Sequence, residues 1–148
     1  MRKTISKAII MALILSFSCL AAMANAQQNQ AKEEQAMTRQ GNYIFTLSDK
    51  VTRTPVKYKN RFGIVIAADL YMPKNFDESR QYPGLIVGSP YGGVKEQGAG
   101  IYAQNMAERG FIALAFDPSY NGYSGGEPRH LSSPDLFVED FSAAVDYL

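Results

Sequence analysis

The chain has 148 residues, a formal net charge of +1 at neutral pH, one cysteine and one histidine. This length allows one domain at most, and the near-zero charge gives no electrostatic reason to expect a nucleic acid as partner. With only Cys19 and His130 available, the sequence excludes a disulfide framework and argues against a metal site built from histidine or cysteine. The composition is that of an ordinary globular chain.

Residues 1–26 have the three-part pattern of a secretory signal peptide. Three basic residues in the first seven positions precede an apolar run at residues 8–23, and residues 24–26, Ala-Asn-Ala, offer a cleavage site. A retained membrane anchor is an alternative, but the run is shorter than the roughly 20 residues that span a bilayer. Lipid modification of Cys19 is a second alternative. It is disfavoured because the bulky Phe17 stands where small residues would be expected before the cysteine. We expect cleavage and export to the periplasm or the extracellular space.

Residues 27–49 are predicted to be a polar leader, because residues 27–42 are rich in glutamine and charge and lack apolar periodicity. Cleavage would remove three basic residues and no acid, which leaves 12 basic and 14 acidic residues. The remaining chain is near neutral and has no cysteine, so we expect no membrane partner after cleavage. Folded structure is expected over residues 50–148.

The first folded element is predicted to be a β-hairpin. Residues 56–59 alternate apolar and polar side chains, residues 60–63 are turn formers, and residues 64–72 resume with a β-branched start. Pro73 ends the second strand. Residues 74–82 then form a polar connection.

A strand-helix-strand unit follows. Residues 85–87 and 111–116 are apolar without alternation, as in parallel strands that are covered on both faces. Between them, apolar residues recur at helical spacing, and Gly110 is a helix stop. The stripe comprises Ala99, Tyr102, Ala103, Met106 and Ala107.

A second helix is predicted from Ser133 to the end of the sequence. Ser133, Pro134 and Asp135 suit an N-cap, a first-turn proline and an acid near the positive end of the helix dipole. Its apolar stripe comprises Phe137, Phe141, Ala144, Val145 and Leu148.

The order of elements and four stretches resemble the N-terminal part of an α/β-hydrolase, in the branch near dienelactone hydrolases and acetyl xylan esterases. The stretches are LYMPKNF, YPGLIVGSPYGGVKEQ, FIALAFDPSYNGYSGGEPR and DLFVEDFSAAVDYL. The resemblance covers roughly residues 50–148. It implies an α/β fold in which a hairpin and a strand-helix-strand-helix unit precede the strand of the nucleophile. That nucleophile would fall about 10 to 20 residues beyond Leu148.

The resemblance implies the N-terminal portion of an exported serine hydrolase. Such an enzyme acts on an ester-like or amide-like carbonyl of a small molecule by acylation and deacylation, and needs no metal or cofactor. Nucleophile, acid and base would all lie outside this chain. The alternative is a noncatalytic product: a truncated remnant, or a binding domain with half of a hydrolase sheet.

The stretch Gly88-Ser89-Pro90-Tyr91-Gly92-Gly93 follows the first parallel strand. The resemblance implies that one oxyanion-hole N–H comes from here, from Tyr91 or, as second choice, Gly92. Glycines allow the backbone to approach a substrate carbonyl closely. In many relatives a histidine stands where this chain has Ser89. A purely structural turn is the alternative.

Ser124 lies in a match to the G-x-S-x-G signature at residues 122–126. A nucleophile elbow runs directly from strand into helix. Here seven residues separate Ser124 from the strand end near Phe116, and Gly-Gly-Glu-Pro follows. We therefore interpret the match as a flexible loop, with Ser124 as nucleophile the alternative. His130 is predicted to be a loop residue, because the resemblance places the catalytic histidine beyond this chain.

Asp117 follows the second parallel strand, at the edge of the sheet where α/β active sites gather. We expect it to bind loop N–H groups, with a catalytic role the alternative. A glycosidase pair of Asp117 and Glu127 is a further alternative, although nothing in the sequence fixes their separation.

Overall fold

The computed structural model describes residues 22–23, 25–28 and 42–148. The chain divides into two units between residues 41 and 42, and the described residues of the first unit are helical. Most of the predicted signal peptide, residues 1–26, lies outside the described residues. None of the described helices is long and apolar enough to cross a bilayer.

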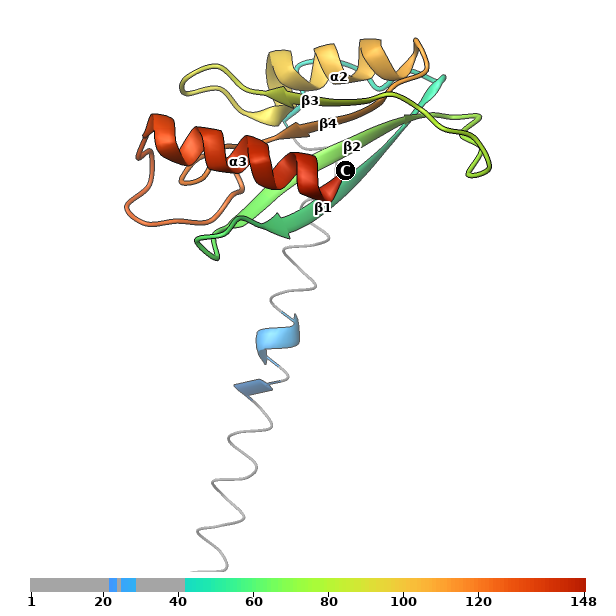
Figure 1. Cartoon of the computed structure of the whole chain (residues 1–148). Helices are drawn as coiled ribbons and strands as arrows, with labels where there is room; N and C mark the ends of the chain where they lie inside the picture. The colour runs from blue at the N-terminus through green and yellow to red at the C-terminus, as the bar shows by residue number, and fades with distance from the viewer. Residues whose placement is uncertain (1–21, 24, 29–41) are drawn as a thin grey trace, which may run out of the picture. The chain divides into compact units, whose positions relative to one another are not determined.

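The second unit is built on a four-stranded sheet with the order β1-β2-β4-β3 (Figure 1). β1 pairs with β2 as an antiparallel hairpin, β2 pairs with β4 antiparallel, and β3 pairs with β4 parallel. The strands are β1 (Val51–Lys59), β2 (Val65–Pro73), β3 (Gly84–Gly88) and β4 (Ile112–Phe116). The predicted hairpin and parallel pair are both confirmed.

Helices cover both faces of this sheet, α2 on one and α3 on the other (Figure 1). Alternate residues of β4 serve the two faces: Ala113 and Ala115 pack toward α2, whereas Leu114 and Phe116 pack toward α3. The helical segments are the π-helical turn η1 (Lys95–Ala99), α2 (Gly100–Ala107) and α3 (Pro134–Tyr147). The predicted α/β fold class is confirmed.

The N-terminal boundary of the folded unit differs from the sequence expectation. β1 begins at Val51, five residues before the predicted start, because Pro55 interrupts the alternating pattern yet is tolerated in an edge strand. Residues 42–49, expected in the leader, belong to the compact unit, and Phe45 packs on the core under α2. The half-buried side chains of Tyr43 and Phe45 explain why this segment belongs to the folded unit.

Ala99, Ala103 and Ala107 of the predicted α2 stripe are buried, which confirms most of it. Tyr102 was wrongly included, because its side chain is 56% exposed. The predicted stripe of α3 is confirmed in part: Ala144 is buried and Phe141 packs edge-on against Phe116. Phe141 nevertheless remains 42% exposed and Val145 63% exposed. The other buried residues of α3 lie outside the stripe and are Glu139, Asp140 and Ala143. The burial of the two acids was not expected, and the hydrogen bonds that accompany it are described below.

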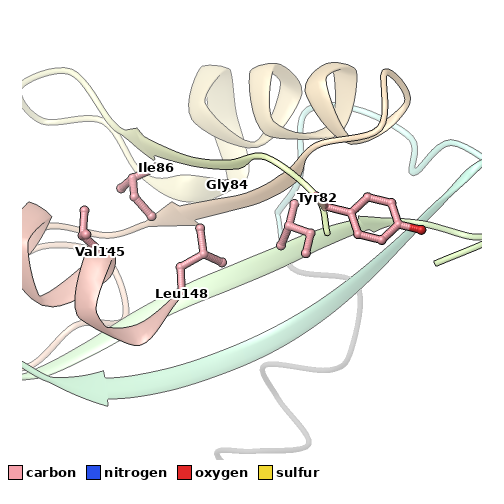
Figure 2. Close-up of a pocket in the computed structure, with 6 residues that line it drawn as sticks. Tyr82, Gly84, Ile86, Val145 and Leu148 are labelled. Atoms are coloured by element: carbon pink, nitrogen blue, oxygen red, sulfur yellow. The ribbon is translucent and has the colours of Figure 1, made fainter. Parts of the chain in front are cut away.

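A pocket of about 350 Å³ lies beside β3 at the amino end of the parallel strands, where Gly84 pairs with Ile112. Figure 2 shows Val145 of α3 and Leu148, the residue after α3, facing Ile86 and Gly84 of β3 across it. The pocket is mostly apolar and lies at the opposite end of β3 from Gly88, the last residue before the predicted oxyanion loop. It is therefore not part of the site described next.

Candidate oxyanion loop and the buried acid beneath it

The loop of residues 89–94 connects β3 to η1 at the carboxyl edge of the parallel strands. A tight turn shapes it: the Gly93 N–H donates to the Pro90 carbonyl at 2.8 Å. Gly92 has φ of 73°, a left-handed conformation that favours glycine. The sequence places this glycine where the backbone needs it.

The backbone N–H groups of Tyr91 and Gly92 have no hydrogen-bond partner within residues 42–148. The Tyr91 side chain is 81% exposed, and Gly92 is exposed as well. Unpaired backbone donors at the end of a parallel strand can bind an oxyanion. The two residues named from the sequence thus retain the chemistry that the role requires.

Asp117 lies directly after β4 and is fully buried. Its Oδ1 accepts the backbone N–H of Lys95 at 2.7 Å, and its Oδ2 accepts the backbone N–H of Tyr123 at 2.9 Å. The Lys95 ammonium lies 3.2 Å from Oδ2. The expectation that Asp117 binds loop N–H groups matches this geometry.

Lys95 and Glu96 complete a buried charged cluster with Asp117. The Lys95 ammonium pairs with both carboxylates and lies 4.4 Å from the centre of the Tyr123 ring. Burial alone would lower the pKa of Lys95, but the Asp117 and Glu96 carboxylates outweigh it and hold that pKa above its ordinary value of 10.5. The sequence analysis missed this cluster, since a Lys-Glu pair usually indicates an exposed face.

A second buried acid lies on β2, on the side of the sheet that α2 covers. Tyr43 donates its hydroxyl to Asp69 Oδ2 at 2.6 Å, and the Arg53 guanidinium lies 3.5 Å from the centre of the Tyr43 ring. Burial raises the pKa of Asp69, although the bond from Tyr43 opposes this. Tyr43 falls in the predicted leader, so its anchoring role was not visible in the sequence.

Ser124 is buried and has two hydrogen bonds inside the fold. Its hydroxyl donates to the Asp117 carbonyl at 2.7 Å and accepts the backbone N–H of Ala67 at 2.9 Å. The side chain thus joins the loop to β2, and its proton points at a carbonyl, not at a histidine. This geometry does not fit an exposed nucleophile.

The loop that carries Ser124 has more internal hydrogen bonds than the flexible loop we expected. Tyr120 donates its backbone N–H to Gly125 at 2.7 Å, and Gly125 donates to Val65 of β2 at 2.7 Å. The Arg129 guanidinium donates to the carbonyls of Gly122, Ser124 and Gly126. The Arg129 bonds join carbonyls within the loop, and the Gly125 bond holds the loop against β2. Arg129 lies outside the G-x-S-x-G motif.

His130 is exposed, and its backbone N–H donates to the Tyr120 carbonyl at 2.8 Å. The structure therefore places it on the loop surface, as expected. Glu127 is also exposed, whereas both oxygens of Asp117 are bonded to donors in the interior. A buried, occupied carboxylate does not suit a glycosidase pair, and the described residues contain no cluster of three or more potential metal ligands.

The acids of α3 hold the hairpin turn. Asp140 accepts the Asn60 side chain at 3.0 Å and both the backbone N–H and the hydroxyl of Ser119 at 2.7 Å. Glu139 accepts the Arg61 backbone N–H at 2.8 Å. Both buried acids of α3 therefore have hydrogen-bond donors, which offset the cost of burying their charges.

Comparisons with known proteins extend this picture. No protein-family model matches the chain. The uncharacterized protein PA2218 of Pseudomonas aeruginosa is 48% identical over 139 residues, which are 94% of this chain and 37% of that protein. The uncharacterized protein YcjY of Escherichia coli is 53% identical over 89 residues, which are 60% of this chain and 29% of that protein.

Solved structures share the fold, and three of them serve as examples. The crystal structure of PA2218 matches with a TM-score of 0.69 at 57% identity, over 72% of this chain and 33% of that one. The α/β hydrolase GrgF from Penicillium sp. sh18 matches with a TM-score of 0.57 at 26% identity, over 65% of this chain and 32% of that one. An acetyl xylan esterase from Paenibacillus sp. R4 matches with a TM-score of 0.55 at 17% identity, over 78% of this chain and 44% of that one. At this identity the match shows a shared fold alone.

The chain carries part of an α/β-hydrolase fold. It spans about a third of the length of PA2218 and YcjY, the curated relatives that it matches. GrgF is named an α/β hydrolase and the Paenibacillus protein an acetyl xylan esterase.

Proposed function

We propose that this chain contributes the oxyanion loop of a serine hydrolase that acts on ester-like or amide-like carbonyl groups of small molecules. One observation carries the proposal: Tyr91 and Gly92 present N–H groups that have no partner within residues 42–148, directly after a parallel strand. In acyl transfer, such donors bind the oxygen that becomes negative in the tetrahedral intermediate. Tyr91 is the preferred donor and Gly92 the second.

The proposal assigns the nucleophile, acid and base to residues outside this sequence. No hydrogen bond joins Ser124 to His130 within residues 42–148. The Ser124 hydroxyl instead donates to the Asp117 carbonyl and accepts the backbone N–H of Ala67. The match to only a third of PA2218 supports this assignment. The resemblance of its motifs supports a parent in the branch near dienelactone hydrolases and acetyl xylan esterases.

A chimaera tests this function most directly. This chain would replace the matched portion of PA2218, with which it shares 48% identity. The chimaera should hydrolyse a short-chain p-nitrophenyl ester and react with a fluorophosphonate probe at a serine of the PA2218 portion. The 148-residue chain alone should remain unlabelled.

Two outcomes would oppose the proposal. Labelling of the isolated chain that Ser124→Ala abolishes would make Ser124 the nucleophile. A folded chimaera without hydrolysis or labelling would instead favour the noncatalytic remnant or binding domain. Circular dichroism establishes which chimaeras are folded.

We also propose that the chain is exported, on the strength of its basic start, apolar run and Ala24-Asn25-Ala26 site. Expressed in a Gram-negative bacterium, it should be recovered from the periplasm with Gln27 as its first residue. Mass spectrometry of the purified chain reads this terminus. An intact chain beginning at Met1 in the membrane fraction would contradict it.

A further inference from the structure

We propose that Asp117 is a positioning residue for the 89–94 loop: one carboxylate holds the start of η1 and the loop of residues 118–126 together. This inference rests on the proposed function, because it concerns how that function's N–H donors are held. Asp117 is fully buried, so it acts through other residues and not on a substrate.

The 89–94 loop has two anchors. Its first end continues from β3, which pairs with β4 up to Gly88 and Phe116. Residues 90–94 bond only among themselves and to Gln97 within the described part of the chain. The second anchor is therefore the bond of 2.7 Å from the Lys95 N–H to Asp117.

The other oxygen of the carboxylate fixes the neighbouring loop. Asp117 Oδ2 accepts the Tyr123 N–H at 2.9 Å. Gly122 allows this approach: its φ is 51°, and a Cβ there would lie 2.3 Å from Asp117 Oδ2. The glycine before Tyr123 thus serves the carboxylate and not a nucleophile elbow.

Charge strengthens the arrangement. The Lys95 ammonium lies 3.2 Å from Asp117 Oδ2 and also pairs with Glu96, all in the interior. Hydrogen bonds to an ionised acceptor are stronger than neutral ones, and burial limits competition from water. Lys95 therefore contributes both its backbone and its side chain to the same carboxylate.

Amide hydrogen exchange in the 148-residue chain tests the inference without any catalysis. In the wild type, the amides of Lys95 and Tyr123 should be protected and those of Tyr91 and Gly92 should exchange fast. Asp117→Asn turns one acceptor oxygen into a donor that faces N–H groups. Exchange at Lys95 and Tyr123 should then rise roughly 10- to 100-fold, the range for losing a hydrogen bond to a charged group.

Asp140→Asn is the matched control, because Asp140 is equally buried but bonds Asn60 and Ser119 instead. Its exchange changes should spare Lys95. Equal effects of both variants at Lys95 would overturn the inference. If Asp117→Asn does not fold, the exchange rates of the wild type test the inference instead. A wild-type Lys95 amide that exchanges as fast as the Tyr91 amide would overturn the inference.

In the chimaera, Asp117→Asn should lower kcat by more than it raises KM, since the oxyanion donors act in the transition state. A change confined to KM would contradict the positioning role. If the wild-type chimaera is inactive, the proposed function fails, whereas the exchange experiment still judges the role of Asp117 in holding the loop.

Discussion

Ser124 shows how a residue in a catalytic motif can be purely structural. Its hydroxyl fills a position between the Asp117 carbonyl and the Ala67 N–H, both in the buried interior. Without the hydroxyl, both backbone groups would lose a partner in a place that water does not reach easily. An unpaired buried polar group costs more than the net value of an ordinary hydrogen bond.

Ser124→Ala should therefore destabilise the chain by about 1 to 3 kcal/mol. Urea unfolding followed by circular dichroism measures this. Ser79→Ala is the control, because the Ser79 hydroxyl bonds Asp77 at an exposed site, and it should change the free energy of unfolding by less than about 0.5 kcal/mol. Equal stability of the wild type and Ser124→Ala would show that the two bonds contribute nothing.

For single residues, the sequence predicted where a residue lies in the fold better than which groups it bonds. The place of Asp117 after a strand was enough to expect that it binds loop N–H groups. Tyr123 lies in the loop that follows Asp117, whereas Lys95 follows the other parallel strand. That Lys95 would be a donor depends on how β3 and β4 are paired, which local sequence does not encode. Lys95 and Asp140 look like ordinary solvated charges in the sequence, so their burial could not be foreseen.

The packing of α3 on β3 depends on two glycines of that strand. A Cβ on Gly88 would lie 2.3 Å from Phe141 Cζ, and a Cβ on Gly84 would lie 2.8 Å from Leu148 Cδ2. The missing side chains let the helix lie close to the strand. Phe141 also packs edge-on against Phe116, with ring centres 5.0 Å apart.

Gly88→Ala should accordingly destabilise the chain by about 1 to 3 kcal/mol, as overpacking does. Phe141→Leu in the same chain should recover part of this loss, and the double-mutant cycle measures the coupling. Gly98→Ala is the control, since no atom lies within 4 Å of its added Cβ, and it should stay within about 1 kcal/mol of the wild type. Independent effects of the Gly88 and Phe141 substitutions would contradict the contact.

The elements themselves could largely be predicted, because β4 is a continuous apolar run, α2 has apolar residues at helical spacing, and Gly110, with φ of 91°, follows the end of α2. Two features could not. η1 has no pattern of its own, and its shape depends on the bond from Lys95 to Asp117. The burial of Asp140 on α3 accompanies a hydrogen bond from Asn60, which is 80 positions away.

In the folded unit as a whole, buried tyrosines and Lys95 should make the free energy of unfolding depend on pH in the alkaline range. Burial raises the pKa of Tyr58 and Tyr71 above the ordinary 10.0, and neighbouring carboxylates raise that of Lys95 above 10.5. Groups whose pKa is raised by folding stabilise the fold fully below their unfolded values. That stability is lost as pH rises through the folded values.

The urea midpoint should therefore be steady near neutral pH and fall above about pH 10, together with the rise of tyrosinate absorbance. Tyr58→Phe should make the fall less steep. It should cost little at neutral pH, because the Tyr58 hydroxyl has no hydrogen-bond partner within the described residues. A midpoint that is unchanged through the alkaline range would contradict the burial of these tyrosines.

A pair of substitutions in the chimaera tests whether the 89–94 loop binds an oxyanion through the backbone N–H of Tyr91. Tyr91→Pro removes the N–H donor, so kcat should fall roughly 100- to 1000-fold with a much smaller change in KM. Tyr91→Phe keeps the donor and should retain most activity. Equal losses in both variants would assign the role to the Tyr91 hydroxyl, and full activity in both would remove this loop from the catalytic site.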